Sequence, residues 1–237
     1  MMMSIFEMDH RIKVYNESKE NKVFKNSLIK SYDILHHTIN VCKMPYVAYK
    51  TLCDSHKIID ILHEFEPCKA LWIYRNYRDL ANSYDRKWPH ADRAIRIVCT
   101  GGTGGGWFQE GVSEASQHIL RDIYSPHLTR YDCLCLAWWA RNRLVIENNL
   151  GDLPNVLLVD YDRLVQHKFD ECNTIYQFLG LDFRERMVAD VHAESIGRHQ
   201  VPAINPDVQH LCEDLTGTLE QLFLSNRALH ALEVSKA

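Results

Sequence analysis

The sequence contains no long hydrophobic run. Its purely apolar stretches are short, as residues 156–159 illustrate, and they fall far below the ~20 residues that cross a bilayer. Residues 1–9 also lack the basic region followed by an apolar core that marks a secretory signal. We therefore expect no membrane span, and nothing in the sequence supports export.

A concentrated positive charge is also missing. The 27 Lys and Arg residues are scattered along the chain and are outnumbered by 31 Asp and Glu residues, which gives a formal net charge of −4. A nucleic-acid backbone is neutralised by a dense basic face. We therefore expect no nucleic-acid partner.

The cysteines and histidines show no metal-site spacing. The eight cysteines lie mostly within apolar stretches, without the pattern of a zinc site or of a small disulfide framework. Buried thiols in a reducing compartment are the simplest interpretation, which predicts a cytoplasmic protein. The histidines show no helical pairing with carboxylates, so we expect no metal.

The composition is that of an ordinary globular protein. Apolar residues make up 46% and charged residues 24% of the 237 residues, which suits one domain or a small pair. We predict a single domain over residues 1–237. A helical period of apolar residues, interrupted at residues 16–21, predicts that residues 1–44 form a helical N-terminal segment.

Apolar runs predict three strands, at residues 45–50, 70–74 and 155–160. Helical periods follow each of them, and a βαβ unit accounts most simply for the first two strands. Buried strands that alternate with helices are typical of an α/β fold. We therefore predict a mainly parallel sheet flanked by helices.

Residues 89–130 interrupt this alternation. Five of the ten glycines lie within residues 101–106 of this segment, and such a composition disfavours regular structure. We predict an irregular insertion with a glycine-rich surface loop. The loop has no nearby Lys followed by Ser or Thr, so it fails the template of a phosphate-binding loop.

Candidate functional residues lie where the strands end, because ligands of open parallel sheets bind beyond the carboxyl ends of the strands. Arg75 leaves a strand and precedes a helix, so its guanidinium and the first helical amides can hold an anion together. The hydroxyl of Ser83, eight residues later, can point back to the same anion. A purely structural pairing of Arg75 with Asp79 or Asp54 is equally consistent with the spacing.

Residues 71–84 resemble the 3′-phosphate-binding stretch of the sulfotransferase superfamily. That stretch is a strand followed by Arg-Asp/Asn-x-x-Asp, with a Ser eight positions after the Arg. Further blocks are similar to other motifs of the family and occur in the same order: residues 49–52 (a strand ending in Lys-Thr), 156–164 (Tyr-Glu-Asp-Leu), 175–181 (Phe-Leu-Gly-Leu) and 195–199 (Ser-x-Gly-Arg). The ordered set carries the resemblance more than any single motif.

The resemblance implies a P-loop NTPase-like α/β fold. It also implies that a sulfuryl group is transferred, without a metal, from 3′-phosphoadenosine 5′-phosphosulfate to a hydroxyl or amine of a small-molecule or glycan acceptor, leaving 3′-phosphoadenosine 5′-phosphate. By the same resemblance Arg75, Ser83 and Arg198 bind the donor's 3′-phosphate, with Ser195 as a further candidate. Lys50 faces the bridging oxygen and stabilises charge on the departing phosphate.

The acceptor side matches the family less closely. A His often follows the Lys-Thr pair in this family, and Leu52 occupies that position here. Asp54 and His56 are the nearby candidates for the base, with an N-cap role for Asp54 and an exposed first-turn position for His56 as the favoured alternatives. Trp107 is a candidate acceptor contact, whereas the helical spacing of Trp138 predicts a core residue.

One motif of the family has no counterpart. Family members hold the 5′-phosphosulfate with an early strand and a Gly/Ser/Thr-rich loop, and nothing in residues 1–45 resembles them. We therefore expect an N-terminally incomplete or variant fold. A catalytically inactive or truncated binding module stays open as an alternative, as does a small-molecule kinase on a related fold. The sequence makes no prediction of oligomeric state.

Overall fold

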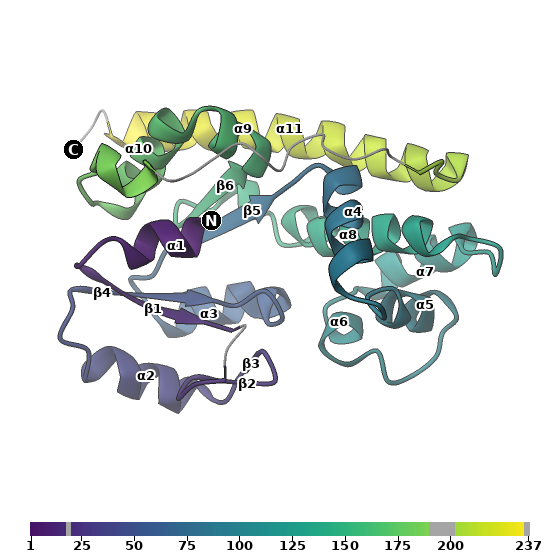
Figure 1. The fold of residues 1–237 in the computed structure, drawn as a ribbon, viewed down its shortest axis with the longest axis horizontal. Helices are drawn as coiled ribbons and strands as arrows, with labels where there is room; N and C mark the ends of the chain where they lie inside the picture. The colour runs from purple at the N-terminus through teal and green to yellow at the C-terminus, as the bar shows by residue number, and fades with distance from the viewer. Residues whose placement is uncertain (18–19, 190–201, 235–237) are drawn as a thin grey trace. The chain divides into compact units, whose positions relative to one another are not determined.

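The computed structural model describes residues 1–17, 20–189 and 202–234 (Figure 1). The chain forms two compact units. Unit 1 contains Met1–Ile58 and the described residues from Arg184 to Ala189, and unit 2 contains Ile59–Phe183 and the described residues after Val201. The described elements form a mixed α/β fold in which parallel strand pairs are flanked by helices, as predicted.

Unit 1 is built around a parallel pair of strands. Strand β1 (Ile12–Asn16) pairs with β4 (Tyr46–Lys50) from Ile12↔Tyr46 to Asn16↔Lys50. The rings of Tyr15 and Tyr49 stack across the pair with centroids 5.4 Å apart. The other elements of unit 1 are α1 (Met2–Glu7), β2 (Phe24–Lys25), β3 (Leu28–Ile29), α2 (Tyr32–Asn40), η1 (Ser55–Lys57) and η3 (Glu185–Val188).

The prediction of a helical segment over residues 1–44 is wrong for residues 12–16, which form β1, and for the β2–β3 hairpin. Among the described residues of this segment, only α1 and α2 are helical. Ile12 and Val14 alternate with Lys13, the period of a strand, but five residues are too few to stand out from the helical background. The hairpin turns at Asn26 and Ser27, both at positive φ (51° and 65°), as a two-residue hairpin turn requires.

Unit 2 is built around the parallel pair β5 (Ala70–Tyr74) and β6 (Val156–Asp160), in register from Ala70↔Val156 to Tyr74↔Asp160. Both strands confirm their predictions. The βαβ prediction is not matched by the pairing, because β4 pairs with β1 and β5 with β6. The helices are α3 (Ile58–Glu64), which begins at the unit boundary, then α4 (Tyr77–Lys87), α8 (Arg130–Glu147), η2 (Leu150–Asp152), α9 (Tyr161–Gln166), α10 (Lys168–Leu179) and α11 (Pro206–Val234).

The insertion at residues 89–130 is mostly helical, which corrects the prediction that it is irregular. It contains α5 (Arg93–Cys99), α6 (Gly106–Glu110) and α7 (Glu114–Ile123). Ile95, Val98 and Leu120 are completely buried, so these helices are stabilised by their apolar faces. The glycine-rich loop is confirmed only between α5 and α6, where Gly101 and Gly104 adopt positive φ values of 70° and 96°.

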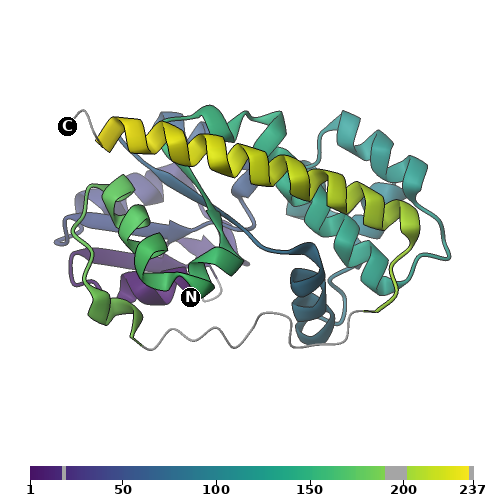
Figure 2. The same cartoon turned by 90° about the horizontal axis from the view of Figure 1, so that it is seen from above.

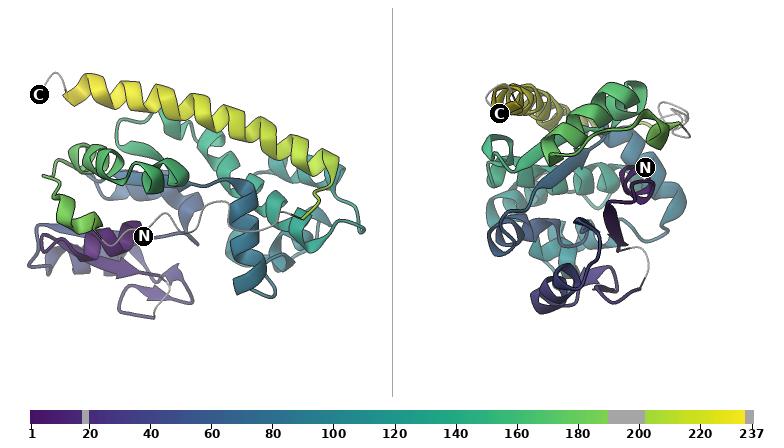
Figure 3. Two further views of the ribbon diagram at one scale, coloured as in Figure 1. Left: turned by 45° about the horizontal axis from the view of Figure 1, so that its top comes forward. Right: turned by 90° about the vertical axis from the view of Figure 1, so that its left-hand side faces the viewer.

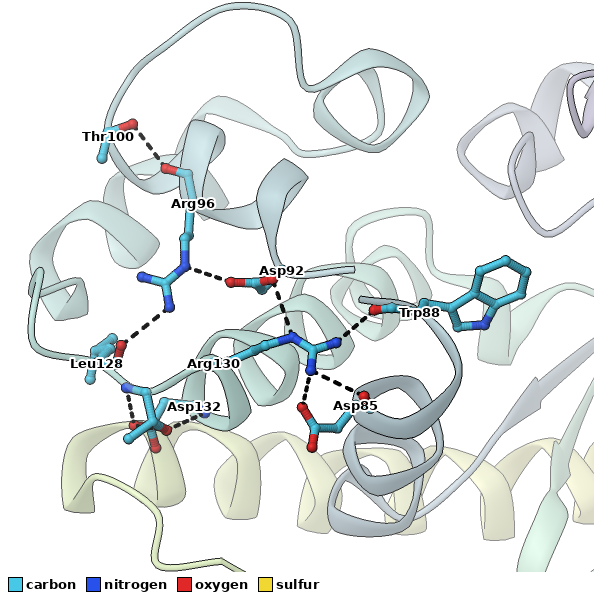
Figure 4. Close-up of polar contacts among 9 residues, drawn as sticks. Asp85, Trp88, Asp92, Arg96, Thr100, Leu128, Arg130 and Asp132 are labelled. Atoms are coloured by element: carbon cyan, nitrogen blue, oxygen red, sulfur yellow. Dashed lines mark hydrogen bonds and ion pairs between the residues drawn. The ribbon is translucent and has the colours of Figure 1, made fainter. Parts of the chain in front are cut away.

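A polar network fastens this insertion to α4 and α8 (Figure 4). Arg130, the first residue of α8, donates to the main-chain oxygens of Asp85 and Trp88 at 3.0 and 2.6 Å. Asp92 shares its carboxylate between Arg130 at 3.4 Å and Arg96 at 2.7 Å. The start of the insertion is therefore tied to the N-terminus of α8 by charge-assisted contacts.

The free edge of β6 is closed by a side chain. Helix α11 runs continuously along α8 and β6 (Figures 2 and 3). From it, Asn226 accepts from the Leu158 N–H at 2.9 Å and donates to the oxygens of Val156 at 3.0 Å and Gly151 at 2.9 Å. The bonds to Leu158 and Val156 are the pair that one residue of a neighbouring parallel strand would make. His230 adds a bond from Nε2 to Val156 at 2.9 Å.

We predict that Asn226→Ala destabilises the protein by about 3 kcal/mol, because it leaves buried main-chain groups without partners. Urea unfolding followed by circular dichroism measures the change. Ser225→Ala removes an exposed hydroxyl from the neighbouring position and is the control, with an expected change within about 0.5 kcal/mol. Equal stabilities of the two variants would contradict the edge-closing role of Asn226.

Candidate functional site

The carboxyl ends of β5 and β6 bring a cation, an aromatic ring and two carboxylates together in unit 2. Arg75 follows β5 directly, and Tyr161 follows β6. The Arg75 guanidinium lies 4.9 Å from the centroid of the Tyr161 ring. It also lies 3.8 Å from Oδ1 of Asp162 and 3.5 Å from Oδ2 of Asp79. These contacts follow from the register of the pair, in which Tyr74 lies opposite Asp160.

Hydrogen bonds hold the main chain of Arg75 and of the following residue, Asn76. Trp138 of α8 donates from Nε1 to the Arg75 oxygen at 2.7 Å. The Asn76 N–H donates to Oδ2 of Asp162 at 3.4 Å, and Asn76 caps α4 by accepting from the Arg78 N–H at 2.9 Å. The prediction that Trp138 is a core residue is confirmed, since only 2% of it is exposed. Its role in holding Arg75 was not predicted.

Electrostatics at this junction are those of one guanidinium between two carboxylates. Both ion pairs are longer than the ~2.7–2.9 Å of a tight charge-assisted hydrogen bond. Burial raises the pKa of Asp162, and the nearby Asp160 carboxylate acts in the same direction. The structural alternative considered for Arg75, pairing with Asp79, is therefore what the structure contains. Asp54 instead binds partners within unit 1.

Ser83 is half-buried on α4. It lies four residues after Asp79, so the two side chains share one face of the helix. Because Asp79 contacts Arg75, Ser83 lies one turn further along the face that Arg75 approaches. Ser195 and Arg198, the other predicted 3′-phosphate ligands, lie outside the described residues.

The predicted reaction-side residues belong to unit 1. Lys50 ends β4, and its Nζ lies 3.2 Å from Oε1 of Glu17. Asp54 is completely buried, and its carboxylate accepts from the Ile29 N–H and from Lys57 Nζ, both at 2.7 Å. Asp54 makes no side-chain cap bond to η1, so its role is to join the β2–β3 hairpin to the turn after β4. His56 is half-buried in η1.

Trp107 lies in the first turn of α6, directly after the glycine-rich loop, and is half-buried. The Arg141 guanidinium lies 5.0 Å from the centroid of its ring. The ring is therefore held by a cation–π contact from α8. Its proposed contact with an acceptor stays a prediction.

Sequence reasoning missed Glu17, because residues 12–16 were assigned to a helix. The alternation of Ile12 and Val14 is the signal that could have marked the strand and therefore its end. Tyr161 and Asp162 were detectable as the residues that follow a buried run, but nothing in the sequence places them beside Arg75. That proximity comes from the pairing of β5 with β6.

Within residues 1–17, 20–189 and 202–234, no group of three or more His, Cys, Asp or Glu side chains is arranged to hold a metal ion. In the same ranges, no helix combines the length and the apolar character needed to cross a membrane.

The chain matches the model of a known protein family. The family model described as "Sulfotransferase domain" matches residues 2–199, so the protein belongs to the sulfotransferase domain family. No curated protein matches it.

Two solved structures are similar to the chain. One is the sulfotransferase domain from the curacin biosynthetic pathway, with 15% identity and a TM-score of 0.46 over 78% of this chain and 66% of that one. The other is the sulfotransferase domain from the Synechococcus PCC 7002 olefin synthase, with 16% identity and a TM-score of 0.46 over 78% and 63%. The chain spans less than two thirds of the length of either domain.

The raised pKa of Asp162 predicts a pH-dependent stability. The folded state holds the proton of Asp162 more tightly than the unfolded state, so the contribution of Asp162 to the free energy of unfolding falls as the pH rises past the ordinary aspartate value of 3.8. Asp162→Asn removes this loss while keeping an acceptor for the Asn76 N–H. We expect the variant to be more stable than wild type at pH 7 and equal to it at pH 3, in urea titrations at each pH.

The matched control for this prediction is Asp152→Asn, which neutralises an exposed carboxylate in the same unit. It should shift stability similarly at both pH values. If Asp162→Asn is instead less stable than wild type at pH 7, the ion pair with Arg75 outweighs the burial of the carboxylate.

Proposed function

We propose that this protein transfers a sulfuryl group from 3′-phosphoadenosine 5′-phosphosulfate to a hydroxyl or amine of a small-molecule or glycan acceptor. Membership of the sulfotransferase domain family supports the reaction class. The observation that carries the donor assignment is the junction of β5 and α4, where Arg75 stands beside the first turn of a helix. This is an anion-binding geometry, and the donor's 3′-phosphate is an anion.

The residues of this junction suit a phosphate. The side chain of Arg75 is only 16% exposed, and the contacts of its guanidinium with Asp79 and Asp162 are long. Phosphate oxygens can therefore replace Asp79 and Asp162 with shorter, bidentate bonds. In this proposal Arg75 binds and orients the 3′-phosphate, and the Ser83 hydroxyl donates to it. The Tyr161 ring limits the approach to one side of the guanidinium.

The reaction-side residues are assigned to unit 1. The bound donor supplies the sulfuryl group, and Lys50 donates a hydrogen bond to the oxygen that becomes negative as that group leaves. Of the two candidate bases we favour His56, because both oxygens of Asp54 are already engaged in a completely buried position. His56 would accept the proton of the acceptor hydroxyl or amine.

Donor binding is tested by calorimetry with 3′-phosphoadenosine 5′-phosphate. Arg75→Ala should weaken binding by about 2 kcal/mol, or roughly thirtyfold, since a charge-assisted hydrogen bond is lost. Ser83→Ala should weaken it by about fivefold. Arg86→Ala removes the same charge from the exposed end of α4 and should leave affinity within about twofold. Binding that Arg75→Ala leaves unchanged would refute the site assignment.

Catalysis is tested by following labelled sulfate from the donor into a panel of phenols, alcohols, amines and oligosaccharides. The proposed function predicts turnover that Lys50→Met lowers by about a hundredfold or more, because transition-state charge loses its partner. Retained nucleotide binding without turnover on any acceptor would identify a catalytically inactive binding module. Phosphate transfer from ATP and magnesium would identify a kinase.

A further inference from the structure

We propose that Glu17 is a positioning residue that holds the Lys50 ammonium in place for sulfuryl transfer, an inference that rests on the proposed function. Glu17 directly follows β1, and Lys50 is the last residue of β4. Asn16 and Lys50 are register partners in the parallel pair. The backbone therefore brings the glutamate to the strand end from which Lys50 projects.

The carboxylate of Glu17 is buried, with 4% of its side chain exposed. A buried carboxylate is costly unless its oxygens are paired, and Glu17 has two partners from one short segment. Oε2 accepts from the Cys53 N–H at 3.1 Å, and Oε1 lies 3.2 Å from Lys50 Nζ. The pairing thus joins the end of β4 to the turn that follows it.

The two partners of Glu17 differ in conformational freedom, and this difference shows which group the contact restrains. The Cys53 N–H belongs to the main chain and fixes the carboxylate. The Lys50 side chain is 39% exposed, and a lysine with that access to water samples many rotamers unless it is held. The ammonium is therefore the group that the contact restrains, and the carboxylate is the fixed point.

Restraint of this kind acts on the rate. A cation stabilises developing charge most when it is already in place, because no reorganisation is then needed during the reaction. Displacing a catalytic group by about 1 Å can lower the rate by about a hundredfold. Glu17 should accordingly affect kcat more than KM, and only through Lys50.

The variant that separates the two contacts is Glu17→Gln. Its amide oxygen can still accept from the Cys53 N–H, but the negative charge opposite Lys50 is gone. Glu20→Gln removes an exposed carboxylate three residues further on and is the matched control. Lys50→Met and the Glu17→Gln/Lys50→Met double variant complete a cycle that measures whether the two residues act together.

Two measurements are made on these variants. The first is kcat and KM for sulfuryl transfer, and the second is the rate at which an amine-reactive reagent modifies Lys50, read by mass spectrometry. We expect Glu17→Gln to lower kcat by about 10- to 100-fold and to speed the modification of Lys50 by about two- to fivefold. In the Lys50→Met background Glu17→Gln should lower kcat no further, and Glu20→Gln should match wild type throughout.

Two outcomes overturn the inference. One is a Glu17→Gln variant with wild-type kcat and wild-type modification of Lys50. The other is an equal loss of kcat in the Lys50→Met background, which would show that Glu17 acts independently of Lys50. A wild-type protein without turnover would refute the proposed function instead, and the modification rates would still decide whether Glu17 restrains Lys50.

Glu17→Asp is the second variant, used in case Glu17→Gln fails to fold. It keeps the negative charge but shortens the side chain by one methylene. It should fall between wild type and Glu17→Gln in kcat and in the modification of Lys50. If both variants lose circular dichroism signal and their activity falls only in proportion to the folded fraction, Glu17 acts on stability alone, and this third outcome also overturns the positioning role.

Discussion

Strand β6 is buried so completely that its polar backbone groups need partners within the protein, and unit 2 is organised around that requirement. Val156, Leu157, Leu158 and Val159 are fully buried. On one edge β5 supplies the partners, and on the other the Asn226 amide and the His230 ring of α11 supply them. Since backbone groups left unpaired in the core cost several kcal/mol, this closure fixes the position of α11 against the strand.

The same constraint shapes the candidate site. The pairing of β5 with β6 places Asp160 opposite Tyr74, and the chain then turns into α9 on one side and α4 on the other. Arg75 and Asp162 meet because each is within two residues of a strand end. The site is therefore a by-product of register, and a shift of one residue would separate the guanidinium from its partners.

In unit 1 the buried groups that need partners are carboxylates. Glu17 and Asp54 are both buried carboxylates, and each joins the turn after β4 to another part of the unit. Asp54 has no exposed surface and binds Lys57, whereas Glu17 binds the partly exposed Lys50. Asp54, a candidate chosen from its position in the sequence, is thus engaged in structural contacts. The carboxylate that contacts Lys50 is that of Glu17, which directly follows β1, a strand that the sequence did not reveal.

The sequence by itself determined the strands β4, β5 and β6 and the family, because short apolar runs and ordered motifs depend on neighbours along the chain. It did not determine β1 or the helices of the insertion. The apolar–polar alternation of β1 lies inside a longer helical pattern and therefore does not identify a strand. The glycines near residue 101 predict irregular structure in a segment where the apolar faces of α5 and α7 form helices. Which strands pair, and therefore which side chains meet Arg75 and Lys50, was decided only by the tertiary structure, because hydrogen bonds between strands join residues far apart in the sequence.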